Sequence, residues 1–244
     1  AGRIGERKSY LYVPDSGRSF LEGKLEHYVN DQLDRRATYR LGKLHGTQEE
    51  FYNDGTLKER TEFWNGLKSG EESRYFNNRQ LSFTGKNKVI FAKDNYISVK
   101  EGEWKFYLQN GRMSARYTYK NGKKEGLCFE YFPDGGVRME TVYKSDKIHG
   151  KAIYRSENGG VQSEFTVYED TVIDGKRKVQ VLDGDRLQYH PNGKLKSKES
   201  YLMGVKTGVW ETYQESGLLY SRVEYKDDCK TGKEQWFDKE GQLT

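Results

Sequence analysis

The sequence predicts an all-β protein: an elongated, single, twisted antiparallel sheet, stacked like an open β-solenoid from consecutive β-hairpin repeats of about 24 residues. Glycines recur 24 residues apart, and all but one of them have an aromatic residue four positions before them. A second glycine follows 15 residues after most of them, and the spacing is recovered after two longer stretches. These anchor glycines are Gly55, Gly111, Gly135, Gly159, Gly193, Gly217 and Gly241, and Arg79 takes the same place in one repeat.

Each repeat is predicted to be two short strands and two turns. Between Gly208 and Tyr225, aromatic and β-branched residues flank a polar turn that ends in Gly217. Asn or Asp precedes glycine in most of these turns, and both residue types tolerate left-handed backbone dihedrals. No segment shows a 3.6-residue apolar period, so we expect almost no helix.

Aromatic and apolar residues also recur at matching places in successive repeats. Those expected to pack between units include Tyr107, Tyr131, Tyr189, Tyr213, Trp104 and Trp210. Stacking buries each row against its neighbours, which no single repeat could do alone. Hydrophobic residues make up only 34% of the chain and aromatic residues 14%, which fits a thin sheet rather than a thick core.

Along the chain, residues 1–22 precede the first repeat and are expected to supply a cap strand, Tyr10–Val13. Residues 23–244 form the repeat array, with enlarged units at 79–110 and 159–192. The extra residues are either tolerated loop insertions or a pair of protrusions that grip a partner. An open sheet edge would also permit a homodimer or strand addition from another chain.

Residues 208–219, with Gly208, Trp210, Tyr213, Gly217 and Leu219, resemble the MORN-type repeat in its bacterial second variant. Residues 119–126 resemble the linking half of that pattern, and the resemblance covers about residues 23–244. It implies a hairpin stack that acts as a scaffold or binding surface. Some bacterial members are labelled antitoxin components, and eukaryotic relatives are linked to membranes and dimerisation.

The residues give no sign of catalytic chemistry. The four histidines lie far apart, and no metal-ligand spacing, nucleophile motif or phosphate-binding loop is present. We therefore expect no enzyme activity, no metal and no cofactor. Acidic residues (37) nearly match basic residues (42), so nucleic acid is not the expected partner.

The candidate binding residues are lysines near the second turn of the repeats, which could form a row along one edge, and residues in the enlarged units. They are Lys43, Lys68, Lys123, Lys147, Lys206 and Lys230, with Lys176, Arg177, Lys178, Ile90 and Phe91. Such a row could attract acidic proteins or anionic lipid, or it could simply keep the sheet soluble.

The resulting hypothesis is a non-catalytic scaffold or adaptor that binds another protein through its sheet face, protruding hairpins or open edge, within a larger bacterial assembly. The alternatives are a membrane-surface adaptor that uses the lysine row and an antitoxin-like protein that neutralises its partner by binding. The first residue, Ala1, favours an exported protein, periplasmic or in the cell envelope. Two unpaired cysteines favour the cytoplasm instead.

Overall fold

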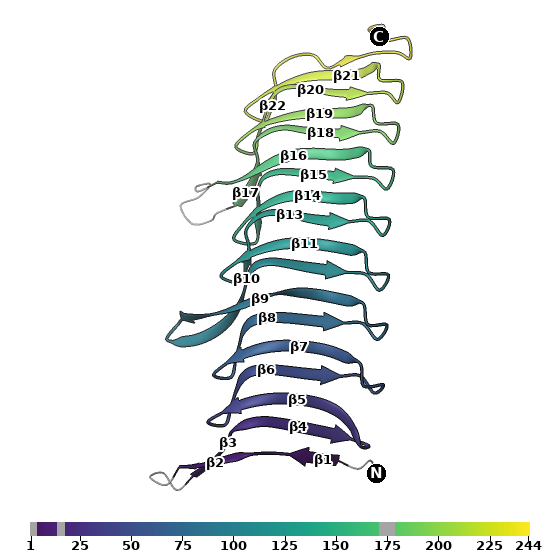
Figure 1. Ribbon diagram of the computed structural model, residues 1–244. Coiled ribbons are helices and arrows are strands. Elements are labelled where there is room, and N and C mark those ends of the chain that lie inside the picture. The colour runs from purple at the N-terminus through teal and green to yellow at the C-terminus, as the bar shows by residue number, and fades with distance from the viewer. Residues whose placement is uncertain (1–3, 14–17, 171–178) are drawn as a thin grey trace. The chain divides into compact units, whose positions relative to one another are not determined.

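The computed structural model describes residues 4–13, 18–170 and 179–244, and every regular element in that part of the chain is a β-strand (Figure 1). The chain divides into two compact units, Ala1–Lys123 and Lys124–Thr244. The short strand β12 (Lys123–Lys124) spans the division. Each unit is described by itself.

The first unit contains eleven of the described strands before β12. They are β1 (Ile4–Arg7), β2 (Tyr10–Val13), β3 (Arg18–Leu21), β4 (Gly23–Val29), β5 (Gln32–Arg40), β6 (Lys43–Phe51), β7 (Leu57–Trp64), β8 (Leu67–Tyr75), β9 (Leu81–Ala92), β10 (Asn95–Tyr107) and β11 (Met113–Lys120). From β4 to β11 each strand pairs antiparallel with the next along the chain. This is an open sheet of consecutive hairpins.

The second unit repeats that arrangement. Its strands are β13 (Gly126–Tyr131), β14 (Val137–Lys144), β15 (Lys147–Arg155), β16 (Val161–Asp170), β17 (Val179–Leu182), β18 (Gly184–Tyr189), β19 (Leu195–Leu202), β20 (Val205–Tyr213), β21 (Leu219–Lys226), β22 (Cys229–Lys230) and β23 (Gln235–Trp236). From β13 to β22 each strand pairs antiparallel with a neighbour in sequence, and β23 pairs with β21. The predicted all-β class of stacked hairpins is confirmed.

In the described part of the chain, one end of a typical repeat is a two-residue hairpin turn with positive φ at both residues. Asn65 (φ 50°) and Gly66 (φ 88°) join β7 to β8, and Met203 (φ 48°) and Gly204 (φ 85°) join β19 to β20. This is the type I′ geometry, whose twist matches the right-handed twist of the flanking strands. Successive turns also stack, because the Gly66 amide donates to the Leu44 carbonyl at 2.7 Å.

The other end is a longer loop that closes on the anchor glycine. In the β6–β7 loop the Gly55 amide donates to the Tyr52 carbonyl at 2.8 Å, and Gly55 has φ of 80°. All seven anchor glycines have positive φ, between 80° and 100°. Arg79, predicted to hold the same place, has φ of 67°, so it adopts the left-handed conformation without being glycine.

This difference yields a prediction about stability. Arg79→Gly should raise the free energy of unfolding by about 1 kcal/mol, because it removes the Cβ that makes the left-handed conformation unfavourable. Gly55→Ala should lower it by about 1 kcal/mol, since a Cβ at Gly55 meets no atom within 4 Å and only the φ of 80° is unfavourable. Urea unfolding followed by circular dichroism measures both, and equal stabilities for all three proteins would contradict the strain argument.

The N-terminal segment is arranged differently from the rest of its unit. The expected cap strand Tyr10–Val13 is β2, and it pairs with β3 in a separate two-stranded sheet. The strand that pairs with β4 is instead β1, with Ile4 opposite Val29. The Gly42 amide donates to the Leu21 carbonyl at 2.9 Å, which ties the end of β3 to the β5–β6 turn.

Few side chains are fully buried, as expected for a sheet one layer thick. The apolar ones among the described residues are Leu25, Ala37, Trp104, Ala115, Cys128, Met139, Ala152, Val167, Val181 and Val223. Trp104, 2% exposed, is the largest of them. The repeat tyrosines end strands before the anchor loops: Tyr107 ends β10, Tyr131 ends β13, Tyr189 ends β18 and Tyr213 ends β20.

The first enlarged unit forms a long hairpin from β9 and β10, which extends beyond its neighbours in the first unit (Figure 1). Its outer part, residues 88–101, is here called the finger. There β9 and β10 pair only with each other, from Lys88 opposite Val99 to Ala92 opposite Asn95. In the second enlarged unit the extra residues lie mostly at 171–178, outside the described residues, and so do Lys176, Arg177 and Lys178.

Candidate functional site

The predicted lysines occupy two different positions in the turn. Lys43 and Lys147 are the first strand residues after it, opposite Arg40 and Lys144. Lys68, Lys206 and Lys230 are the second strand residues, opposite Phe63, Tyr201 and Tyr225. Because side chains alternate across a strand, the first and second positions lie on opposite faces. Lys123 lies in β12.

Lys68, Lys206 and Lys230 each contact the residue four places later in the sequence. Where that residue is glutamate the contact is an ion pair, at 2.6 Å for Lys68 with Glu72 and 2.6 Å for Lys230 with Glu234. Where it is tryptophan the ammonium group lies over the indole ring. The centroid distances are 4.3 Å for Lys100 over Trp104 and 4.7 Å for Lys206 over Trp210.

Lys100 and Lys124 belong to this second position and were not predicted. The Lys124 ammonium group lies 5.1 Å from the Tyr143 ring centroid. The sequence did contain the necessary signal, since both lysines stand two residues before a second glycine, Gly102 or Gly126. The face that carries these lysines and aromatic rings is here called the aromatic face.

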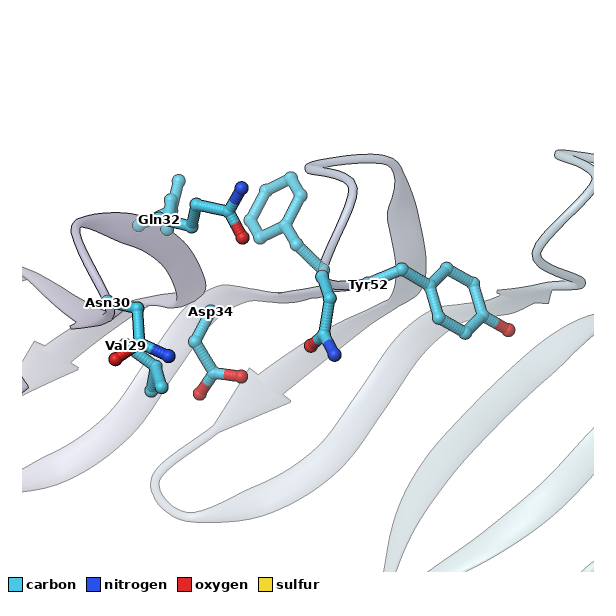
Figure 2. A pocket seen from close by; sticks show the side chains of 8 residues that line it. Val29, Asn30, Gln32, Asp34 and Tyr52 are labelled. Atoms are coloured by element: carbon cyan, nitrogen blue, oxygen red, sulfur yellow. The ribbon is translucent and has the colours of Figure 1, made fainter. Parts of the chain in front are cut away.

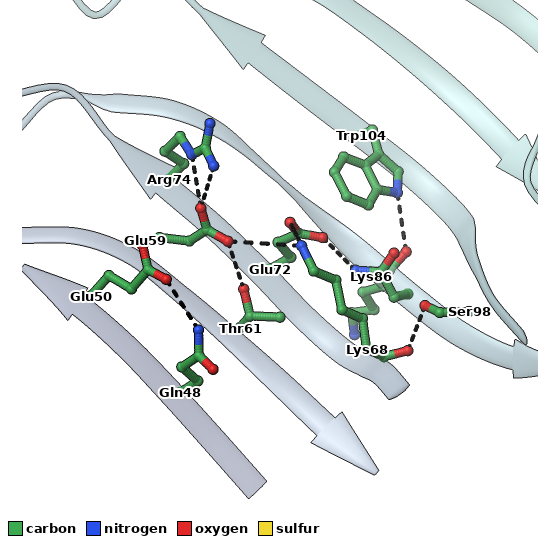
Figure 3. A network of polar contacts seen from close by, with 11 residues as sticks. Gln48, Glu50, Glu59, Thr61, Lys68, Glu72, Arg74, Lys86, Ser98 and Trp104 are labelled. Carbon is green, nitrogen blue, oxygen red and sulfur yellow. Dashed lines mark hydrogen bonds and ion pairs between the residues drawn. The ribbon is translucent and has the colours of Figure 1, made fainter. Parts of the chain in front are cut away.

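On the aromatic face of the first unit, Glu72 is a buried carboxylate, 6% exposed. It accepts hydrogen bonds from the Lys68 ammonium group and from the Asn87 amide, both at 2.6 Å (Figure 3). Burying a charge is costly unless it is paired and hydrogen-bonded, and these two donors satisfy Glu72. The network therefore fixes Lys68 in place and links β8 to the root of the finger.

A second carboxylate, Glu59, extends the network on β7. The Arg74 guanidinium donates to it at 2.5 Å, and Thr61 donates at 3.2 Å (Figure 3). Burial alone would raise the pKa of Glu59, but the hydrogen bond and charge of Arg74, helped by Lys68, lower the pKa below its ordinary value.

The lowered pKa predicts acid sensitivity. A carboxyl group with a depressed pKa in the folded state stabilises the fold above its unfolded pKa of 4.5, and this contribution is lost as pH falls through the folded pKa. We expect Glu59→Gln to reduce the loss of stability between pH 4.5 and pH 3 by up to about 1 kcal/mol after solvent screening. Thermal unfolding from pH 7 to pH 3 measures it. The exposed residue Glu157 provides a control, Glu157→Gln, and the same pH profile for both variants would contradict the prediction.

Beside the network lies a cluster of five aromatic rings from β9, β10 and β11. Phe83 lies 5.8 Å from Trp104 and 6.2 Å from Phe106 between ring centroids. Tyr117 and Tyr119 continue the cluster, at 5.7 Å from Phe106 and 6.3 Å from Trp104, respectively. All but Trp104 are half-buried, so the cluster presents ring surface to solvent. Aromatic pairs of this kind add to stability beyond the area they bury.

The Trp104 indole can pack against β9 because the residue that it covers there, Gly85, has no side chain. A Cβ built on Gly85 would lie 2.2 Å from the indole ring, well inside contact distance. The indole N–H donates to the Lys86 carbonyl at 3.1 Å (Figure 3). Gly85 was not among the predicted residues. The sequence could have indicated it, because a glycine inside a predicted strand often marks a place where another group approaches the backbone closely.

Between the network, the ring cluster and the finger lies a groove of about 390 Å³. The residues that line it are Lys68, Glu72, Phe83, Asn87, Ser98, Val99, Lys100, Trp104 and Phe106. The finger is held at its root, since the Ser98 hydroxyl donates to the Lys68 carbonyl at 2.7 Å (Figure 3) and the Gly122 amide donates to the Lys100 carbonyl at 2.8 Å. The groove has an aromatic floor and polar walls.

The tip of the finger exposes apolar side chains. Phe91 is 64% exposed and Tyr96 is 55% exposed, and their rings meet edge to face at 5.2 Å. Ile97, on the opposite side of the finger, is 41% exposed, and its partner Ile90 is half-buried. Ile90 and Phe91 were predicted candidates, and the structure places them with two further apolar residues at one tip.

A smaller pocket of about 190 Å³ lies near the β4–β5 turn (Figure 2). It is lined by Val29, Asn30, Gln32, Leu33, Asp34, Phe51, Tyr52 and Asn53. The β4–β5 connection is a two-residue turn, where later repeats have a longer loop. The Tyr52 hydroxyl donates to the Tyr75 carbonyl at 2.7 Å and so bridges to the next repeat. The pocket is therefore the space beside a shortened repeat.

Among the described residues, no group of three His, Cys, Asp or Glu side chains is placed to hold a metal ion. No helix in this part of the chain is long and apolar enough to cross a membrane.

Two family models match segments of the chain. The model described as a MORN repeat variant matches residues 44–65, 100–121, 182–202 and 206–227, and the model described as a MORN repeat matches residues 118–137 and 143–161. The chain carries MORN repeats. Such repeats are generally associated with binding of proteins or membranes. Four residues of the aromatic face, Lys100, Trp104, Lys206 and Trp210, lie within matched segments.

No curated protein matches the chain. Among solved structures, the crystal structure of TcdB2-TccC3-TEV is similar over 98% of this chain, with 12% sequence identity and a TM-score of 0.20. The match spans 14% of that longer chain.

Proposed function

We propose that this MORN-repeat protein is a non-catalytic binding module that holds a segment of another protein between the finger and the aromatic face of its first unit. The observation that carries the proposal is the pair of exposed rings, Phe91 and Tyr96, that lie together on one side of the finger tip. Large apolar side chains gathered at a surface are typical of interaction sites, and aromatic residues dominate the energy of protein interfaces.

The groove below the finger supports the same proposal. Its floor offers the faces of Phe83 and Phe106, and its walls offer polar groups that can fix a bound chain in register. The finger is tied at its root through Ser98 and Lys100, so binding would not have to order it first. Such preorganisation lowers the entropic cost of association.

The charges near the finger favour a protein partner over an anionic membrane. Lys86 pairs with Glu71 at 2.9 Å, and Lys88 pairs with Glu101 at 3.6 Å. At the tip, Lys93 stands next to Asp94. Positive charge is thus largely balanced by carboxylates, whereas attraction to anionic lipid requires an excess of Lys and Arg. The antitoxin role implied by the resemblance stays a prediction.

A paired comparison tests the proposal. The double variant Phe91→Ser, Tyr96→Ser removes the apolar tip, and Tyr220→Ser, Trp236→Ser removes a similar exposed pair whose rings lie 5.4 Å apart. We expect a partner captured from source cells by the full chain to bind the first variant at least about tenfold more weakly, as for loss of a hot spot. The second variant should bind as tightly as the native chain.

A photo-reactive phenylalanine at position 91 adds a direct readout. It should form a covalent adduct with the same partner, since Phe91 would contact it. Equal capture by both double variants, or adducts with lipid and none with protein, would overturn the proposal.

A further inference from the structure

The opposite face of the first unit carries a separate feature, a notch of about 230 Å³ where the β5–β6 and β7–β8 turns lie next to each other. Its lining residues are Arg40, Leu41, His45, Trp64 and Asn65. Leu44 has the same place in its repeat as Lys68, so its side chain lies on the aromatic face. Lys43 and His45 flank Leu44 on β6, and their side chains therefore point to the opposite face. The notch is therefore distinct from the groove beside the finger.

The apolar part of the notch is unusually exposed. Trp64 is 48% exposed and Leu41 is 51% exposed. Trp64 is the residue just before a two-residue turn. Other repeats have a basic residue at this position, namely Arg40, Lys120 and Lys144. A tryptophan at such an exposed place is not needed for the turn.

Leu41 is also held in an unfavourable backbone conformation, with φ of 49°. The same turn position carries asparagine at Asn30, Asn65 and Asn121, a residue that tolerates this region. A bulky side chain there costs of order 1 kcal/mol, and strain of this kind often marks a functional surface. Nothing in the folding of the turn requires leucine.

The rim of the notch is positively charged. Arg40 and Lys43 are exposed, and neither forms an ion pair with any residue in the described ranges. Next to Arg40, the Leu41 amide donates a hydrogen bond to the Glu22 carboxylate at 2.8 Å. The notch thus combines the apolar side chains of Leu41 and Trp64 with the positive charges of Arg40 and Lys43.

We propose that this notch binds an acidic peptide segment of a partner, which inserts one large apolar side chain between Leu41 and Trp64 and places carboxylates against Arg40 and Lys43. Tryptophan and arginine are the residues most often found at the energetic centre of protein interfaces. Arginine can also bind a carboxylate through two parallel hydrogen bonds. The first unit then has two binding surfaces, one on each face.

Selection from a library tests this inference without a known partner. Random 12-residue peptides displayed on phage would be selected on the full chain carrying Phe91→Ser and Tyr96→Ser, so that the finger does not contribute. We expect enriched peptides to carry Asp or Glu on both sides of one Leu, Phe or Trp. Because the finger is already removed, this result does not depend on the function proposed above.

Labelled copies of the enriched peptides would then be titrated with variants of the full chain. Arg40→Glu with Lys43→Glu, and separately Trp64→Ala, should each weaken binding at least about tenfold. The charge-matched control Lys226→Glu with Lys239→Glu changes two exposed residues that do not line the notch, and it should leave affinity within about twofold.

Three outcomes would overturn the inference. They are the absence of any enriched peptide, enrichment of peptides that lack acidic residues, and binding that survives both Arg40→Glu with Lys43→Glu and Trp64→Ala. Vesicles of phosphatidylserine and phosphatidylcholine provide a parallel probe. If they bind the chain through Arg40 and Lys43 while the peptides do not, the site is a lipid contact and the inference fails.

Discussion

Replacing Gly85 by alanine is expected to lower the free energy of unfolding by about 3 kcal/mol, the upper part of the range for overpacked cores. The added Cβ would lie 2.2, 2.4 and 2.5 Å from three atoms of the Trp104 indole. A rigid ring cannot yield as the end of a flexible side chain does. Trp104 is 2% exposed and its N–H is bonded to the Lys86 carbonyl, so it can move only by breaking that contact.

Urea unfolding of the full chain, followed by circular dichroism, measures the effect of Gly85→Ala. The matched control is Gly232→Ala, because a Cβ on Gly232 meets no atom within 4 Å and its φ lies outside the positive range. Its stability should stay within about 0.5 kcal/mol of the native chain. If Gly85→Ala were as stable as this control, the close contact between β9 and Trp104 would be refuted.

The backbone of the repeat was predictable because its turns require particular residues. The anchor glycines all take positive φ, and the sequence spacing even placed Arg79 among them. Turn chemistry acts within a few residues, so a single sequence contains it in full. The antiparallel pairing of each strand with its neighbour follows directly from those turns.

The faces of the strands were harder to predict, and the lysine row shows why. Lys43 and Lys68 stand three and two residues before their second glycines, Gly46 and Gly70. Both lysines were predicted to lie in one row along a single edge of the sheet. A shift of one residue along a strand moves a side chain to the other face, so a small error in alignment separates residues that were expected together.

The candidate site could be predicted only in part because it depends on contacts between repeats. Ile90 and Phe91 were singled out from the enlarged unit, but nothing local to them indicates the groove. That groove requires Asn87 to reach Glu72 and Ser98 to reach the Lys68 carbonyl, contacts between residues 15 and 30 positions apart. Such long-range contacts follow from packing, which sequence spacing alone does not specify.

Trp104→Ala is expected to cost about 4 kcal/mol, within the range for removing a fully buried tryptophan. The substitution empties the space above Gly85, removes the hydrogen bond to the Lys86 carbonyl and takes away the ring under the Lys100 ammonium group. Trp210→Ala is the matched control. Trp210 has the same place in its repeat and an equivalent bond to the Ser200 carbonyl at 3.1 Å, but it is only half-buried and should cost less.

Combining the two substitutions isolates the contact itself. With Trp104 replaced by alanine, the methyl group of Ala at position 85 enters empty space, so Gly85→Ala should then cost less than about 0.5 kcal/mol. The coupling between the two sites would thus exceed about 2 kcal/mol, as expected for residues in direct contact. If the two effects were additive instead, the double variant would lose about 7 kcal/mol, the sum of the single losses. That result would mean that the indole of Trp104 does not need a glycine at position 85.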